Sequence, residues 1–299
     1  MSSLDLGSAD TNTADMNAAD MNTADIASDR TGLRAQVALF LRVTRMNLKA
    51  QTAYRSEFVL GLLFGLVWQG SMILFAGVLL LRFPGLGGWK QGDVLLIASM
   101  RLVSHSLYVA GFSNIGQLSM TVQEGRMDGF LLRPMPVYRQ VLLSKFQVNS
   151  FGDLLAGAGI FVVALYRLDA AWTPAKALYL VCGILGGTMI EAGLQTLLAI
   201  ASLRFTGMFT WTSWVDQMIS TFGNYPLNVL PSPAKDALTF VLPVAFVAYL
   251  PAAVITGRTA STGLPLWLTL AAPALGVGFF LAAKATWYRS LRLYQSVGG

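Results

Sequence analysis

Seven long apolar stretches fill most of the chain after residue 56, and they constrain its fold more than any other feature. They are Phe58–Leu81, Val94–Ile115, Phe146–Leu165, Ala177–Leu203, Phe209–Leu230, Ala237–Ile255 and Leu264–Trp287. Most reach the roughly 20 residues that a helix needs to cross about 30 Å of hydrocarbon. Hydrophobic residues make up 55% of the chain and charged residues only 12%, which excludes an ordinary soluble domain. The sequence therefore predicts an all-α integral membrane protein.

The basic residues between the stretches indicate the side of each loop, because Lys and Arg concentrate in cytoplasmic loops. Several of them flank both ends of the apolar region, so both termini are predicted to be cytoplasmic and the number of crossings to be even. With six crossings, fourteen basic residues lie on the cytoplasmic side, six lie outside and Arg101 lies within a span. This bias predicts a multi-pass protein of the cell (inner or plasma) membrane with six transmembrane helices.

The stretch Ala237–Ile255 is the one predicted not to cross. Prolines interrupt it and the segment before it, at Pro226, Pro231, Pro243 and Pro251. A proline inside a helix removes a backbone donor and clashes with the preceding turn, whereas irregular backbone at membrane depth is tolerated when protein surrounds it. We interpret residues 226–258 as a re-entrant helical element between the fifth and sixth spans. The alternative is that this stretch is a kinked span and that Phe209–Leu230 lies outside the membrane.

The rest of the chain divides around one transmembrane domain at residues 57–290. Residues 1–30 carry Asp at five-residue intervals and little apolar surface, which predicts a disordered acidic cytoplasmic tail. Basic side chains gather on one side of residues 31–56, which predicts an amphipathic interfacial helix against anionic lipid; a cytoplasmic extension of the first span is the alternative. Residues 291–299 form a cytoplasmic C-terminal tail. We expect no binding to nucleic acid.

Several enzyme and metal-binding classes are excluded by what the chain lacks. It has one cysteine, Cys182, and one histidine, His105, so neither a Cys-based nor a His-rich metal site is predicted. No nucleophile and base stand at a catalytic spacing. No Gly-Lys pair occurs, so the chain has no Walker-type phosphate loop and cannot itself bind ATP in that way. We expect no enzyme activity and no cofactor in this chain alone.

The loop between the second and third spans is the most specific segment. It reads Val122-Gln-Glu-Gly-Arg-Met-Asp-Gly-Phe-Leu-Leu-Arg-Pro-Met-Pro136. Its glycines are possible helix breaks and its prolines end any helix. On these residues alone, the loop is either a short helix on which another protein pushes or a tight turn at the membrane surface.

Glu124 to Pro134 resembles the "G-x-x-D-x-x-L-L-R-P" loop of ABC-2-type exporter permeases. The likeness is to the branch that bacteria encode as two permeases beside one ATPase. A second segment, Tyr225-Pro-Leu-Asn-Val-Leu-Pro231 with the later Phe240-Val-Leu-Pro-Val-Ala-Phe246 and Tyr249-Leu-Pro251, is similar to a proline-rich segment of that branch. Together with the six spans, the likeness covers roughly residues 33–290.

The resemblance implies the permease subunit of an ATP-driven exporter of a small molecule or amphiphile. It implies two partners: a nucleotide-binding subunit that holds ATP and Mg²⁺, and a second permease, either identical or a sister chain. The loop would be the coupling helix that docks into the ATPase. Its coupling residues are Glu124, Gly125, Arg126, Asp128, Gly129, Phe130, Leu132, Arg133 and Pro134.

Four ionisable residues inside the spans are further candidates, because burial of charge in a membrane is costly. These are Glu191, Asp216, Arg101 and His105, and they either line a pathway for a cationic substrate or pair with each other for assembly. Trp211 and Trp214 either stack on a flat substrate or serve as packing and interfacial residues. The alternative function is a stand-alone, proton-coupled secondary transporter that uses Glu191 and Asp216 as proton relays.

Overall fold

The computed structural model describes residues 85–132, 135–144, 149–205 and 207–291, together with scattered helical positions between Arg42 and Leu74. Most of the predicted amphipathic helix at 31–56, half of the first apolar stretch and almost all of both predicted tails lie outside these residues.

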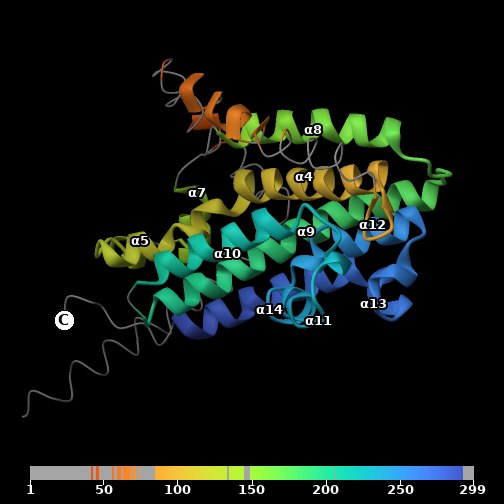
Figure 1. Ribbon diagram of the computed structural model, residues 1–299. Coiled ribbons are helices and arrows are strands. Elements are labelled where there is room, and N and C mark those ends of the chain that lie inside the picture. Colours follow the sequence, from red (N-terminus) through yellow and green to blue (C-terminus); the bar gives the residue numbers. More distant parts are fainter. Residues whose placement is uncertain are drawn as a thin grey trace, which may run out of the picture.

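Five long helices form the body of the described protein. They are α4 (Gln91–Gly116), α8 (Asn149–Arg167), α9 (Pro174–Ser202), α10 (Met208–Phe222) and α14 (Ala272–Leu291). Figure 1 shows them running along a common direction, with α8 beside α4 and α9 between α4 and α14. α10 packs chiefly against α9.

The long helices agree with the apolar stretches to different degrees. α4, α8 and α9 begin and end within three residues of the predicted bounds. Within the described residues, two helices are long and apolar enough to cross a membrane, Gln91–Gln123 and Pro174–Ser202. α10 ends at Phe222, eight residues before the predicted end, because Gly223 and then Pro226 do not continue a helix. The number of crossings stays a prediction.

A chain of short helices connects α10 to α14. It comprises η1 (Leu227–Val229), α11 (Ser232–Asp236), η2 (Ala237–Val241, a π-helical turn), η3 (Val244–Phe246), α12 (Tyr249–Thr256), η4 (Thr259–Thr262) and α13 (Leu266–Leu270). Prolines explain several of the breaks: Pro226, Pro231 and Pro243 each stand directly before a new element. We call residues 226–258 the broken segment. Its entry into a membrane stays a prediction.

A small hairpin precedes α4 and departs from the all-helical prediction. β1 (Gly85–Leu86) pairs antiparallel with β2 (Trp89–Lys90). Gly87 and Gly88 between them have φ of 57° and 85°. A two-residue hairpin turn needs positive φ at such positions, which glycine adopts without steric cost.

α9 lies at the centre because glycines let other backbones approach it closely. A side chain at Gly186 would collide with the backbone of Pro273, and one at Gly276 would collide with the backbone of Gly186. A side chain at Gly187 would collide with the carbonyl of Val247 in the broken segment. Close glycine contacts of this kind are typical of helices packed in membranes. They fix α14 and the broken segment against α9.

Two apolar clusters occupy the two ends of the bundle. One contains Trp89 and Ile97 with residues of the broken segment, and the other contains Met127, Tyr138 and Trp287. Figure 1 shows α5 (Leu118–Gln123) at one end of the molecule, and α12 and α13 at the opposite end. The loop after α5 and the broken segment are therefore far apart.

Candidate functional site

The loop that follows α5 presents a polar surface at one end of the bundle. Glu124 and Arg126 form an ion pair with side chains 44% and 67% exposed. Between them, Gly125 has φ of 67° and open space around its Cα. After the turn comes α6 (Asp128–Leu131), and the residue directly after it, Leu132, is apolar and 87% exposed. The predicted coupling residues Gly129 and Phe130 lie on α6, with Gly129 exposed and Phe130 half-buried.

On its buried side, the same loop is fixed to the rest of the bundle by packing and hydrogen bonds. Met127 is completely buried in the second apolar cluster. The Gln140 amide on α7 (Val137–Leu143) donates to the carbonyls of Phe130 at 2.9 Å and Met135 at 2.5 Å. Asn114, near the end of α4, donates to the Leu142 carbonyl at 2.8 Å. These hydrogen bonds connect the loop to α7, and α7 to α4. Arg133 and Pro134 lie outside the described residues.

Tyr138 joins this anchored region to α9 and α14. Its hydroxyl shares a hydrogen bond with Thr196 at 3.1 Å, and its ring meets Trp287 edge to face with centroids 5.5 Å apart. Burial raises the pKa of Tyr138 to about 12, so the phenol stays protonated at neutral pH.

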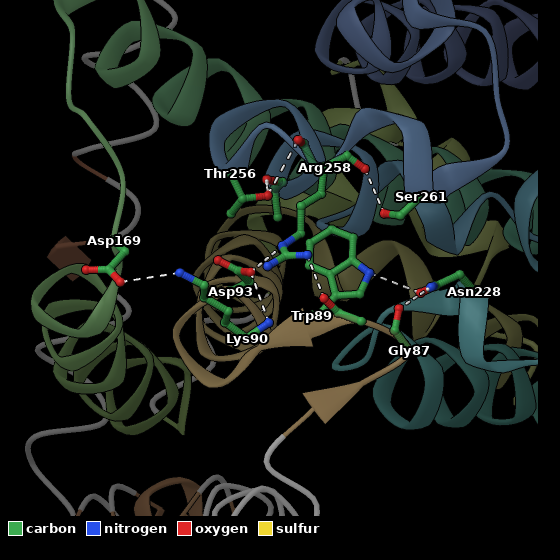
Figure 2. Close-up of polar contacts among 12 residues, drawn as sticks. Gly87, Trp89, Lys90, Asp93, Asp169, Asn228, Thr256, Arg258 and Ser261 are labelled. Atoms are coloured by element: carbon green, nitrogen blue, oxygen red, sulfur yellow. Dashed lines mark hydrogen bonds and ion pairs between the residues drawn. The ribbon is translucent and has the colours of Figure 1, made fainter.

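At the opposite end, the hairpin is tied to the broken segment by a set of contacts that we call the hairpin latch (Figure 2). Arg258 donates to Asp93 at 2.5 Å and to the Gly88 carbonyl at 2.5 Å. Trp89 donates to Asn228 at 3.1 Å, and the Asn228 amide donates back to the Gly87 carbonyl at 2.8 Å. These residues come from the hairpin, the start of α4 and both ends of the broken segment.

Packing adds to the polar contacts of the latch. The Arg258 guanidinium lies 5.8 Å from the ring centroid of Trp89, and that ring lies 5.5 Å from the ring of Tyr249. Asp93 also accepts from the backbone N–H of Lys90 at 3.1 Å, which caps α4. A further exposed ion pair, Lys90–Asp169 at 3.4 Å, reaches the residues after α8. The latch therefore fixes the start of α4 to the broken segment.

In the middle of the bundle, the structure brings the four ionisable candidates together on three helices. We call them, with Gln195 and Ser220, the polar cluster. His105 on α4 hydrogen-bonds Glu191 on α9 at 2.8 Å. Arg101 donates to Ser220 on α10 at 2.9 Å, and Gln195 donates to Asp216 at 2.6 Å. Arg101 and Glu191 are almost completely buried, 2% and 1% exposed.

The cluster is incompletely satisfied. Among the described residues, Arg101 Nε, Glu191 Oε1 and Gln195 Oε1 are buried and have no hydrogen-bond partner. An unpaired buried polar atom loses its hydration without compensation, so such atoms usually contact water or a ligand. Gln195 and Ser220 were not predicted from the sequence, because their side chains are neutral. Gln195 lies one helical turn after Glu191, and this spacing could have indicated that both side chains lie on the same face of α9.

Trp211 and Trp214 lie apart from the cluster. They are 58% and 54% exposed on α10, with ring centroids 6.3 Å apart and edge to face. Ser213 and Gln217 are exposed on the same helix. This face of α10 combines aromatic and polar side chains that no described residue covers. Of the four predicted prolines, Pro251 lies buried in the first turn of α12, where a proline is tolerated.

Comparison with known proteins yields one match. A family model described as "ABC-2 family transporter protein" matches residues 66–298, which is most of the chain. No curated protein and no solved structure matches it significantly.

Proposed function

The chain belongs to the ABC-2 family of transporter proteins, and from that premise we propose that it is the membrane subunit of an ATP-driven exporter. A separate subunit binds ATP with Mg²⁺ and hydrolyses it, because this sequence contains no Gly-Lys pair from which to build a Walker-type loop. The cargo is a small molecule or amphiphile that leaves from the cytoplasm or the inner leaflet.

The observation that carries this proposal is the anchored loop at residues 124–132. Its exposed side offers Glu124, Arg126 and Leu132 to a partner, while Met127 is locked into the core. α5 and α4 continue directly from it through the bundle, to the hairpin latch at the other end. A partner ATPase that closes on ATP would move this loop and, with it, one long helix against the others.

A second permease is the other proposed partner, either an identical copy or a sister chain. The exposed face of α10 supports this, because Ser213 and Gln217 are unsuited to lipid while Trp211 and Trp214 offer large contact areas. Both termini are proposed to be cytoplasmic and the chain to cross the membrane six times. On this topology the 124–132 loop is cytoplasmic and the broken segment lies towards the outside.

Co-purification with the ATPase tests the proposal. The chain is expressed with its partner ATPase, and the ratio of the two proteins is measured after affinity purification. Arg126→Glu and Leu132→Asp are expected to lower the ratio about tenfold, as loss of a central contact typically does. Arg204→Glu is the matched control, since Arg204 is exposed in a different loop on the same predicted side. An unchanged ratio in both loop variants would contradict the docking role.

A stand-alone, proton-coupled secondary transporter is the second candidate. The polar cluster favours it, because His105, Glu191 and Asp216 are titratable and lie on neighbouring helices. Liposomes that hold only this chain distinguish the two functions. Uptake driven by a proton gradient without ATPase or ATP would support the second candidate, whereas the exporter proposal predicts none.

A further inference from the structure

Two basic residues stand near the C-terminal end of α14 without an anionic partner. Lys284 lies one helical turn before Tyr288, and Arg289 directly follows that tyrosine. Lys284 and Tyr288 are half-buried, whereas Arg289 is exposed. Among the residues that the structure describes, neither basic side chain has a carboxylate partner. Both positive charges can therefore serve an anionic ligand.

The aromatic ring between them holds one of the charges. The Lys284 ammonium nitrogen, Nζ, lies 6.0 Å from the ring centroid of Tyr288, a cation–π contact. A basic and an aromatic residue together near the end of a membrane helix are typical of the level of the lipid headgroups.

These side chains surround a small open patch on the helix. Around the helix axis, Lys284 is followed by Tyr288, then by Ala285 and then by Arg289, within an arc of about 140°. Ala285 is exposed, and its single methyl group leaves the surface open between the two basic residues. A ligand over Ala285 can be reached by both long basic side chains at once.

The patch continues an exposed apolar side of α14. Val277, Leu281, Ala285 and Arg289 follow one another at intervals of four residues, and all four are exposed. The patch also lies at the same end of the bundle as the 124–132 loop, because the neighbouring Trp287 belongs to the same apolar cluster as Met127 of that loop. In the proposed topology this end is cytoplasmic, and the exposed apolar side faces lipid.

We propose that the phosphate of an anionic phospholipid from the inner leaflet binds over Ala285, between Lys284 and Arg289. Ammonium and guanidinium groups form charge-assisted hydrogen bonds with phosphate, and basic side chains at the cytoplasmic surface attract anionic lipid. The hydroxyl of Tyr288 adds a further donor, and an acyl chain follows the exposed apolar side of α14. The site rests on the membrane topology proposed above, but neither on the ATPase nor on transport.

Thermal unfolding of the purified full-length chain in a non-ionic detergent tests the site. The melting temperature is measured against increasing phosphatidylglycerol, with phosphatidylcholine of the same acyl chains and the soluble glycerol phosphate as comparisons. Phosphatidylglycerol is expected to raise the melting temperature saturably, by at least about 3 °C over phosphatidylcholine, because a ligand that binds only the folded state stabilises it. Glycerol phosphate at the same concentration is expected to give no rise, since it lacks the acyl chains. The assay contains no ATPase and no transport step, so its failure leaves the exporter proposal standing.

Two double variants locate the effect. Lys284→Gln with Arg289→Gln is expected to raise the phosphatidylglycerol concentration of the half-maximal response about tenfold. Arg167→Gln with Lys176→Gln is the matched control, because it also removes one exposed and one half-buried positive charge, at the ends of α8 and α9 near the hairpin latch. The control is expected to keep the wild-type response.

Two single variants complete the test. Lys284→Arg keeps the charge and is expected to keep the response, which a role in packing alone does not predict. If the double variant does not fold, Arg289→Gln alone, at an exposed position, is expected to weaken the response about threefold.

Three results would overturn the proposal. The first is an equal response to the two phospholipids, which would mean that the negative charge is not recognised. The second is an equal response to glycerol phosphate, which would identify a site for free phosphate instead of lipid. The third is an equal response in the Lys284 and Arg289 variants and in their control, because the lipid would then bind elsewhere or by unspecific attraction.

Discussion

The hairpin latch and the polar cluster both join α4 to other helices through an arginine and carboxylates, but they differ in completeness. In the latch, Arg258 donates to both Asp93 and the Gly88 carbonyl. Trp89 donates to Asn228, whose amide donates to the Gly87 carbonyl. In the cluster, three buried polar atoms of described residues have no partner. A complete network is suited to holding two segments together. An incomplete one leaves acceptors for a proton, a water or a ligand.

The largest effect is expected from breaking the latch. Arg258→Gln leaves Asp93, only 10% exposed in its side chain, without its cationic partner. Loss of one partner of a buried ion pair costs roughly 3 kcal/mol of unfolding free energy. Thermal unfolding in detergent measures this, with Arg204→Gln as an exposed control that changes less than about 0.5 kcal/mol. Adding Asp93→Asn to Arg258→Gln should recover part of the loss. If Arg258→Gln melts like the control, the latch does not stabilise the fold.

A smaller loss of stability is expected from the cluster, together with a functional defect. Glu191→Gln keeps the side-chain shape and a hydrogen-bonding group for His105, so we expect a loss of about 1 kcal/mol. Transport by the assembled complex should nevertheless fall, because the charge of the cluster changes. Unfolding and transport are measured on the same preparation. A stability loss larger than that of Arg258→Gln would contradict the contrast between the two regions.

Trp89→Phe sharpens the description of the latch itself. The substitution removes the N–H that donates to Asn228 at 3.1 Å but keeps an aromatic ring against Arg258 and Tyr249. A single neutral hydrogen bond contributes about 1 kcal/mol, so the melting temperature should fall less than in Arg258→Gln. An equal fall would mean that the indole, rather than the ion pair, holds the hairpin.

The smallest effect is expected at Tyr138, outside both regions. Tyr138→Phe loses the bond to Thr196 and should cost at most about 1 kcal/mol. The folded state holds the pKa of this phenol at about 12, above its ordinary 10.0, so the wild type loses stability as pH rises from 10 towards 12. The variant should lose less over that range. Equal pH profiles for the two proteins would refute this contribution.

The sequence predicted the long elements well, because apolar length is a local property. α4 and α9 lie within three residues of their predicted bounds. The hairpin was missed, although Gly87-Gly88 between Leu86 and Trp89 is a typical turn signal. Arg101, His105, Glu191 and Asp216 were also singled out from their place in apolar stretches, which is again local information.

The pairing of ionisable side chains in the latch and in the cluster was not predictable. Arg258 and Asp93 are 165 residues apart in the chain, and no residue pattern near either one indicates the other as its partner. The pairing of His105 with Glu191, 86 residues away, depends likewise on how α4 packs against α9. The glycines that set this packing let two helix backbones approach each other closely. A pattern of glycines in the sequence suggests such a contact but does not say which helices meet.

The partner ATPase is proposed to dock on the 124–132 loop, at the end of the bundle opposite the broken segment. Photo-crosslinking in cells tests it most directly, with a photoreactive residue placed at Leu132 or, as a control, at Val229, which is 43% exposed in η1 at the other end. We expect the Leu132 position to give an adduct that contains an ATPase subunit, and the Val229 position to give none. An ATPase adduct at Val229, or its absence at Leu132 in a complex that still contains the ATPase, would contradict the claim.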